Sequence, residues 1–174
     1  MEIKRLNLEE IEKNKDEILK IYNESFGYTD GTMGEFLFER IKDSFNRDVN
    51  SIFLACFMKE KIVGFIYGFD FISENWFYKE IFDDVKDKID FDNIFEFNEI
   101  AVDKNYRRKK IGTFLIETLM KNINAKKLIF CTDKENNKGA ISFYKTLGSK
   151  VIVDNFYFKS FKSTAKLILT LDNN

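Results

Sequence analysis

The chain has 174 residues, of which 44% are hydrophobic and 33% are charged. This composition is normal for one globular domain with a full core, and no apolar run approaches the roughly 18 residues that span a bilayer. The 28 basic and 29 acidic residues nearly balance, so bulk charge favours neither nucleic acid nor an anionic membrane as a partner. We therefore expect a single cytoplasmic domain over 1–174.

The sequence contains no histidine and only two cysteines. Ser-His-Asp and Cys-His catalysis are thereby excluded, and no zinc cage can be assembled, so no metal is expected. Acid–base chemistry must use Glu, Asp, Tyr, Lys or Cys. Cys56 and Cys131 lie in apolar, strand-like runs, where buried free thiols are more typical than a disulfide.

The pattern of apolar residues predicts strands and helices in a definite order. The predicted strands are 3–6, 51–57, 61–71, 94–102, 127–131, 150–158 and 164–171. The predicted helices are 8–22, 35–45 (with Phe36 on its apolar stripe), 111–123 and 137–147. The second and third strands are separated by a short polar turn, which indicates an antiparallel hairpin. We predict an α+β fold with a central mixed, mostly antiparallel sheet of six to seven strands flanked by helices.

A charged and aromatic insertion at 73–93 separates the third and fourth predicted strands. Within it, Trp76, Ile81, Val85 and Ile89 recur at near-helical spacing. This spacing is typical both of a surface helix packed on the sheet and of a lid over a substrate.

The most informative stretch joins the strand 94–102 to the helix 111–123 through a basic turn. Its cations are Arg107, Arg108, Lys109 and Lys110. The first N–H groups of a helix are unpaired, and the helix dipole adds roughly half a positive charge there. Gly112 allows a ligand to approach the backbone closely. The stretch therefore predicts a phosphate site, although a solvated basic turn would have the same composition.

A second motif occupies 137–148. Asn137 is placed to cap a helix and Gly148 to end it. Ala140 and Tyr144 follow Asn137 at i+3 and i+7, so the three share one helix face. A small residue and a phenol on one face suit a pocket, and a core aromatic residue is the alternative reading of Tyr144.

The two motifs together resemble the GNAT acyltransferase superfamily. The matching residues are Val102-x4-Arg107-x2-Lys110-x-Gly112 and, downstream, Asn137-x2-Ala140-x2-Phe143-Tyr144-x3-Gly148. The resemblance is close over 95–148 and concerns only the order of elements over 3–71. It implies a GNAT-like fold and an N-acetyltransferase that uses acetyl-CoA.

The resemblance also implies roles for individual residues. The backbone of Ile100, Ala101 and Val102 would pair with the pantetheine amides. The pyrophosphate would be wrapped by Arg107, Arg108, Lys109, Lys110, Ile111, Gly112 and Thr113. Asn137 would contact the cofactor arm with Ala140 beside it, and Tyr144 would lie near the sulfur.

This sequence departs from the family pattern at Lys110, where the family usually has Gly. A side chain at this position would either crowd the phosphate or replace lost backbone contacts with a charge-assisted one. A second departure is Ser149, where an aromatic residue commonly follows the Gly.

Acetyl transfer to an amine requires a base, because an alkyl amine with a pKa of about 10.4 is neutral only about once in a few thousand molecules at pH 7. Glu96 and Glu99 are the candidates, acting directly or through water. They lie three positions apart and so face opposite sides of a regular strand, unless a bulge brings them together. Tyr144 is the candidate acid for the departing thiolate.

The sequence says less about the amine that accepts the acetyl group. The segments 22–45 and 73–93 carry carboxylates and aromatic residues, which suit a cationic amine. A polyamine, an aminoglycoside-like compound, an amino-acid derivative and a protein amine all remain open, with a small molecule preferred. A non-catalytic acyl-CoA-binding or sensor module is the alternative function, and the sequence is compatible with a monomer or a homodimer.

Overall fold

A computed structural model describes residues 1–173 of the chain. The chain forms two compact units, the first from Met1–Phe69 with Asn98–Ile123 and the second from Asp70–Phe97 with Asn124–Asn174. The strand β4 (Ile94–Val102) contributes its first half to the second unit and its second half to the first. The single domain over 1–174, with 73–93 as an insertion, stays a prediction.

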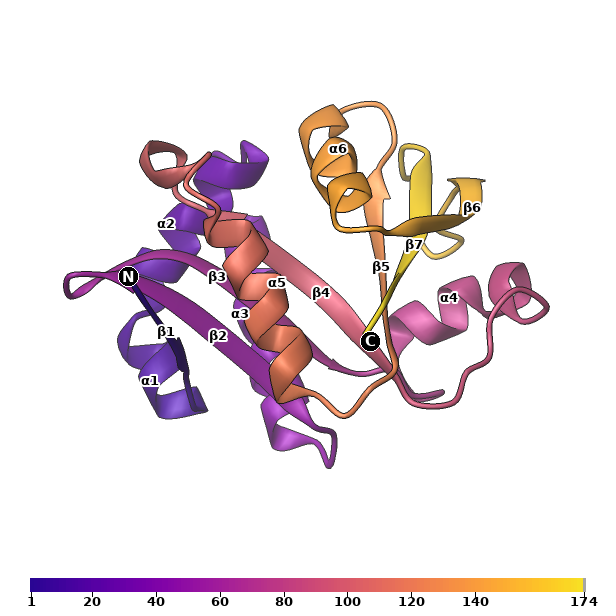
Figure 1. The fold of residues 1–174 in the computed structure, drawn as a ribbon, viewed down its shortest axis with the longest axis horizontal. Helices are drawn as coiled ribbons and strands as arrows, with labels where there is room; N and C mark the ends of the chain where they lie inside the picture. Colours follow the sequence, from indigo (N-terminus) through magenta and orange to yellow (C-terminus); the bar gives the residue numbers. More distant parts are fainter. Residues whose placement is uncertain (174) are drawn as a thin grey trace. The chain divides into compact units, whose positions relative to one another are not determined.

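The elements follow the predicted order (Figure 1). The strands are β1 (Glu2–Arg5), β2 (Ser51–Met58), β3 (Lys61–Asp70), β4, β5 (Lys127–Asp133), β6 (Lys150–Phe156) and β7 (Lys166–Asp172). The helices are α1 (Leu8–Lys13), α2 (Lys15–Phe26), α3 (Thr32–Asn46), α4 (Trp76–Val85), the 3-10 turn η1 (Lys104–Tyr106), α5 (Ile111–Asn122) and α6 (Lys138–Thr146).

The strands form a seven-stranded mixed sheet with the order β1-β2-β3-β4-β5-β7-β6. β4 pairs with β5 in parallel, through Ile94–Glu96 and Lys127–Ile129, whereas β1 with β2, β2 with β3, β5 with β7 and β6 with β7 pair antiparallel. The structure thus confirms the predicted α+β class and the mostly antiparallel sheet.

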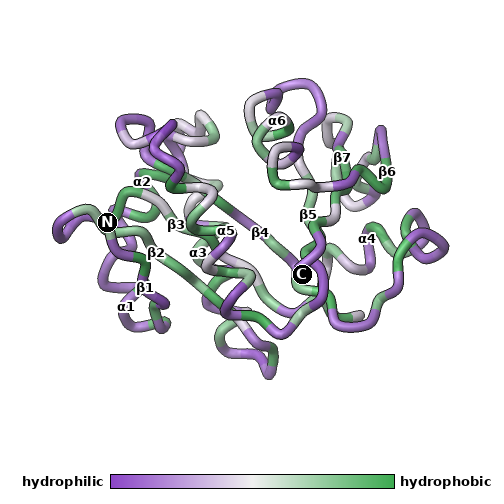
Figure 2. Tube along the Cα trace, in the orientation of Figure 1, coloured by the Kyte–Doolittle hydropathy of each residue, from purple (hydrophilic) through white to green (hydrophobic). Residues whose placement is uncertain are grey.

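In the first unit, α1, α2 and α3 cover one face of β2 and β3, and α5 packs against the other face (Figure 1). Apolar residues fill most of β2, as the green tube in Figure 2 shows. Gly64 of β3 is required on the α5 side: a Cβ there would lie 3.0 Å from the Ala101 carbonyl oxygen and 3.3 Å from Cγ2 of Ile111. The close packing of β3 against β4 and α5 therefore depends on a residue without a side chain.

In the second unit, α4 buries Phe77, Ile81 and Val85 in a cluster with Ile94 of β4 and Ile168 of β7. The insertion is therefore a helix packed on an apolar core, as one of the two readings of its spacing predicted. Trp76 differs from the prediction, since it lies on the exposed side of α4 and contacts other aromatic rings.

Two further expectations were wrong in detail. The helix predicted over 8–22 is two helices, because the chain breaks at Asn14, whose side-chain amide donates to the Glu10 carbonyl oxygen at 2.7 Å. An Asn side chain that bonds to the backbone competes with helix continuation. Phe36, placed on the apolar stripe of 35–45, is 64% exposed, because buried Leu37, Phe38 and Ile41 define a narrower stripe.

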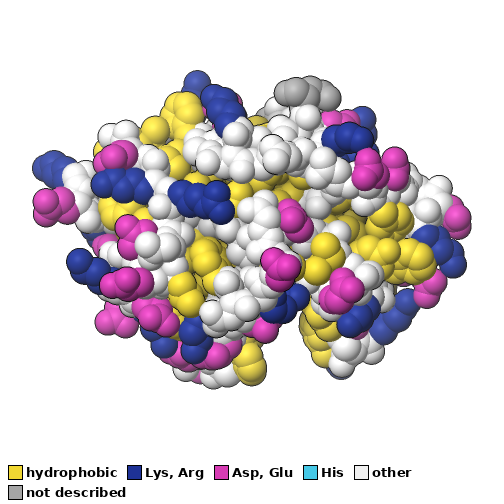
Figure 3. Space-filling view, turned by 90° about the horizontal axis from the view of Figure 1, so that it is seen from below, with side chains coloured by type: hydrophobic (Ala, Val, Ile, Leu, Met, Phe, Trp, Pro, Cys, Tyr) yellow, Lys and Arg dark blue, Asp and Glu magenta, His cyan; other side chains and the backbone are white. Residues whose placement is uncertain are grey.

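Cys56 is buried and Cys131 is partly buried, and the two are not joined by a disulfide, as predicted. Acidic and basic side chains are interspersed on the face shown in Figure 3. Among residues 1–173, no helix combines the length and the apolar character needed to cross a bilayer.

Candidate functional site

One group of predicted site residues lies in the first unit, on the turn that follows β4. The backbone N–H of Asp103 donates to the Val63 carbonyl oxygen at 2.9 Å, which extends the attachment of β4 to β3. The Asp103 carboxylate then accepts from the backbone and side-chain N–H groups of Asn105 at 2.8 and 3.0 Å. These bonds fix the direction in which the chain leaves the strand.

Arg107 folds back onto the strand end. Its Nε donates to the Val102 carbonyl oxygen at 3.0 Å, and its Nη2 donates to Oγ of Ser25 on α2 at 3.3 Å. Ser25 Oγ also donates to the Val102 carbonyl oxygen at 3.4 Å. Arg107 thus fastens the turn to the unit, a role that the sequence did not indicate.

The backbone of this turn is left-handed at two residues, Arg108 with φ 63° and Lys110 with φ 62°. Lys110 is the N-cap residue of α5, and its side chain makes no capping hydrogen bond. A left-handed residue followed by helical ones points successive N–H groups into one concavity, which is an anion-binding arrangement. The geometry also explains why the family favours Gly at position 110, since left-handed backbone costs other residues about 1–2 kcal/mol.

The cations of the turn are exposed. Lys109 Nζ lies 4.9 Å from the centre of the Tyr106 ring, and within the described part of the chain Arg108 and Lys110 form no ion pair. Their charges are therefore available to an anion at the start of α5.

Glu99, on β4, lies at the centre of a polar cluster in the first unit. Its Oε1 is 3.1 Å from Nη2 of Arg40 on α3, and its carboxylate also accepts a hydrogen bond from Tyr22 on α2. Tyr28, in the loop before α3, is hydrogen-bonded to Tyr22. The Glu99 side chain is 15% exposed and that of Arg40 is 38% exposed, so the carboxylate is largely but not fully shielded from solvent.

Burial controls the titration of this cluster. It raises the pKa of Glu99 above its ordinary value, although the ion pair and hydrogen bond with Arg40 and the hydrogen bond from Tyr22 oppose the shift. Burial, together with the Glu99 charge, also raises the pKa values of Tyr22 and Tyr28. Both phenols therefore remain hydroxyl donors at neutral pH.

The two candidate bases are placed differently. Glu96 belongs to the second unit, where it is buried and opposite Ile129 of β5 in the parallel register. Glu99 belongs to the first unit and is partly accessible. Which of them is the base stays a prediction.

A separate group of predicted site residues lies on α6, in the second unit. Tyr144 is 7% exposed, and its ring packs on Phe130, Phe97 and Phe143 with centroids 4.7, 6.0 and 5.4 Å away. The core-aromatic reading of its ring is thus confirmed, and its role as an acid stays a prediction. Ala140, one turn earlier, is partly exposed.

Asn137 corrects one expectation. It occupies the N-cap position of α6, but its side chain does not cap the helix. Instead its Nδ2 donates to Oγ1 of buried Thr132 on β5 at 3.0 Å. The amide is held by the neighbouring strand, which fixes its orientation at the start of α6.

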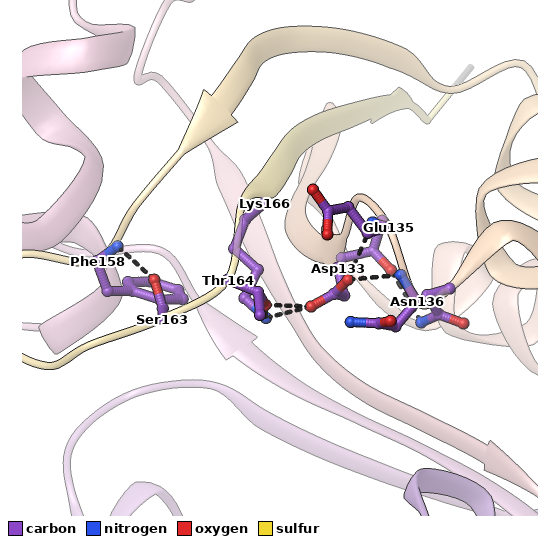
Figure 4. A network of polar contacts seen from close by, with 9 residues as sticks. Asp133, Glu135, Asn136, Phe158, Ser163, Thr164 and Lys166 are labelled. Carbon is purple, nitrogen blue, oxygen red and sulfur yellow. Dashed lines mark hydrogen bonds and ion pairs between the residues drawn. The ribbon is translucent and has the colours of Figure 1, made fainter.

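A network around Asp133 holds the loop that leads into α6 (Figure 4). The carboxylate accepts from the backbone N–H groups of Glu135 and Asn136 at 3.0 and 2.8 Å. It also accepts from Thr164 and from Nζ of Lys166, the latter at 3.1 Å. Burial alone would raise the pKa of Asp133, but these hydrogen bonds and the Lys166 charge hold the pKa well below its ordinary value.

No group of three or more His, Cys, Asp or Glu side chains within residues 1–173 is arranged to hold a metal ion.

Known structures share this fold over nearly the whole chain. A putative acetyltransferase of the GNAT family from Desulfovibrio desulfuricans matches with a TM-score of 0.74, 11% identity and 99% of both chains covered. Aminoglycoside 6'-acetyltransferase type Ii matches with a TM-score of 0.70, 17% identity, and 100% of this chain and 98% of that chain covered. PaiA N-acetyltransferase from Thermoplasma acidophilum, in complex with coenzyme A, matches with a TM-score of 0.63, 19% identity and 98% of both chains covered. No curated protein is significantly similar in sequence.

The match that shows the family comes from the sequence. The model of the acetyltransferase (GNAT) family matches residues 15–148, more than half of the chain and both motifs. The chain belongs to the acetyltransferase (GNAT) family, which confirms the resemblance. It is an acetyltransferase enzyme, and the family to which it belongs uses acetyl-CoA.

We predict that Asp133→Asn destabilises the protein by about 1–3 kcal/mol at pH 7, because several hydrogen bonds to one charged acceptor are weakened together. The folded pKa is depressed, so the contribution is complete above the unfolded pKa of about 3.9 and is lost as pH falls toward the folded pKa. Urea unfolding from pH 7 down to pH 3 should show the gap between wild type and variant closing below about pH 4.

Asp154→Asn is the matched control, since Asp154 pairs with Lys134 on the exposed surface. It should change the free energy of unfolding little at any pH. Equal effects of the two substitutions, or a gap for Asp133→Asn that does not narrow at all between pH 5 and pH 3, would contradict the assignment.

Proposed function

We propose that this enzyme transfers the acetyl group of acetyl-CoA to a primary amine of a small molecule. The observation that carries the proposal is the placement, on one strand–turn–helix of the first unit, of the Glu99 carboxylate and an uncapped, cationic helix start. Acetyl transfer from a CoA thioester to an amine needs a group that binds the CoA phosphates and a base that takes the proton of the amine. This short segment carries a candidate for each.

The turn has the chemistry to hold the pyrophosphate. Arg108, Lys109 and Lys110 supply exposed positive charge, and Ile111, Gly112 and Thr113 supply the first N–H groups of α5. Arg107 would contribute its remaining guanidinium N–H groups while it fastens the turn. We propose that the Lys110 ammonium makes a charge-assisted contact with the pyrophosphate. This contact would replace the backbone contacts that Gly allows in other members of the family.

The thioester arm would be held by main-chain groups. Ile100, Ala101 and Val102 lie beyond the residues of β4 that pair with β5, and we propose that their backbone pairs with the pantetheine amides. Asn137, fixed by Thr132, would contact the arm beside Ala140.

Acetyl-CoA, when bound, supplies the activated acetyl thioester. Glu99 is our preferred base because it is partly accessible, whereas Glu96 is buried. Its raised pKa makes it a stronger base than an ordinary Glu, which suits a group that must accept the ammonium proton. When the C–S bond breaks, the Tyr144 hydroxyl would donate its proton to the sulfur of the departing CoA thiolate.

We predict that incubation with acetyl-CoA and a panel of polyamines, aminoglycosides, amino-acid amides and N-terminal peptides releases free thiol with at least one small amine. Thiol-reagent absorbance measures release, and mass spectrometry should show a product heavier by one acetyl group. Release only with peptides would replace the small-molecule acceptor by a protein. CoA-dependent thermal stabilisation without any thiol release would indicate a binding module instead.

Tyr144→Phe should lower kcat about tenfold or more while leaving the affinity for CoA nearly unchanged, because Phe keeps the packing on Phe130 and loses only the proton donor. Steady-state kinetics with the best amine of the panel would measure this. Tyr157→Phe, at an exposed Tyr of the same unit, is the control and should be silent. An unchanged kcat in Tyr144→Phe would reduce Tyr144 to a packing residue.

Lys110→Gly should distinguish the effect of the left-handed backbone on stability from the effect of the ammonium charge on CoA binding. Removing the left-handed side chain should stabilise the protein by up to about 1 kcal/mol, while loss of the ammonium should weaken CoA binding several-fold. Calorimetric titration with CoA and urea unfolding measure the two effects, with Lys104→Ala as a control for loss of a nearby charge. Unchanged CoA affinity would refute the phosphate contact of Lys110.

Arg107→Ala is less informative, because it also releases the turn from Val102 and Ser25.

A further inference from the structure

Arg40 is the cation that faces Glu99, and it comes from a distant part of the sequence. Its Nη2 lies 3.1 Å from Oε1 of Glu99, which is within hydrogen-bond distance for a charge-assisted contact. Arg40 lies on α3 beside buried Ile41, so its guanidinium reaches Glu99 from the helical layer of the first unit.

The groups about Glu99 come from α2, α3 and the loop between them. Arg40 of α3 supplies positive charge, while Tyr22 of α2 and Tyr28 of the following loop supply phenols. From β3, the Tyr67 hydroxyl donates to the backbone carbonyl oxygen of Arg40 at 3.1 Å. This bond holds the backbone of α3 at the position from which Arg40 extends.

A carboxylate in this setting faces two opposed demands. Shielding from water favours its protonated form, and a protonated carboxyl cannot accept the proton of an ammonium group. An adjacent positive charge favours the ionised form, typically by about one to three pH units. The guanidinium N–H groups also restrict the rotamer of the side chain, because the bond requires one direction of approach.

We propose that Arg40 is a positioning residue of the acetyl transfer, which keeps Glu99 ionised and directed through the hydrogen bond to Oε1 while Tyr22 holds the carboxylate from α2. The inference rests on the proposed function, in which Glu99 is the base. In the step itself, the N–H bond of the acceptor ammonium breaks, an O–H bond forms on Glu99, and the electron pair stays on the nitrogen. Arg40 neither gains nor loses a proton.

The test compares Arg40→Met, Arg40→Lys and the control Arg47→Met. Arg47 lies at the C-terminal end of the same helix and pairs with Asp43 at 2.9 Å, so its removal costs one arginine ion pair without touching Glu99. Carbon-13 NMR of carboxyl-labelled Glu follows the titration of Glu99, whose signal is identified by its absence in Glu99→Gln. The pH profile of kcat/KM is measured with acetyl-CoA and the best amine of the panel.

In Arg40→Met the Glu99 titration should move up by one pH unit or more, and the acidic limb of the kcat/KM profile should move up with it, since protonation inactivates the base. Arg40→Lys should recover part of both shifts, and Arg47→Met should show neither. Arg40→Lys also serves if Arg40→Met does not fold.

Unchanged Glu99 titration in Arg40→Met and Arg40→Lys would overturn the positioning role and leave Glu99 as the base. Full activity of Glu99→Gln would instead refute Glu99 as the base, and with it the role of Arg40 in catalysis. The two failures are therefore distinguishable.

Discussion

The way β4 ends determines where the chemistry of the first unit is placed. The Asp103 N–H continues the attachment of the strand to β3, Arg107 returns to the Val102 carbonyl oxygen, and Gly64 lets Ala101 and α5 approach β3 closely. Because these contacts fix both the strand and the start of α5, the Glu99 carboxylate and the cationic turn keep a constant separation within this unit. A looser strand end would uncouple a base from the turn that is proposed to bind the cofactor.

Two partly buried carboxylates in this protein have pKa values that are shifted in opposite directions. Glu99 receives contacts from Arg40 and Tyr22, yet burial keeps its pKa above the ordinary value. Asp133 receives hydrogen bonds from two backbone N–H groups, Thr164 and Lys166, and its pKa is depressed. The many donors to Asp133 hold a loop in place, whereas the fewer contacts of Glu99 do not offset its loss of water, so its pKa stays raised. The two side chains are similarly exposed, at 15% for Glu99 and 18% for Asp133, so the number of donors separates their pKa values more than the exposed fraction does.

The pattern of apolar residues was sufficient for most of the fold, because the central strands are short continuous apolar runs and the helices carry apolar stripes at helical spacing. It failed where a local side chain overrode the pattern: the Asn14 amide breaks the first helix, and the Asn137 amide bonds to Thr132 instead of capping α6. The cationic turn and Glu99 lie close together in sequence, so a single motif could reveal both. Arg40 and Tyr22 could not be found in this way, because only the fold brings helices α2 and α3 to β4. The sequence showed only that Arg40 is a charged residue next to the buried apolar stripe of α3.

Lys110 limits how this turn can vary among related proteins. The position is exposed, so burial places no restriction on it, but its φ of 62° admits few residue types. Gly and Asn adopt this backbone readily, and β-branched residues are strongly disfavoured there. Few substitutions at position 110 are therefore expected to be neutral, although the side chain is exposed. A relative with Gly at this position avoids the cost of a left-handed backbone but lacks the positive charge of the lysine. The backbone conformation and the charge therefore cannot be optimised independently at this one residue.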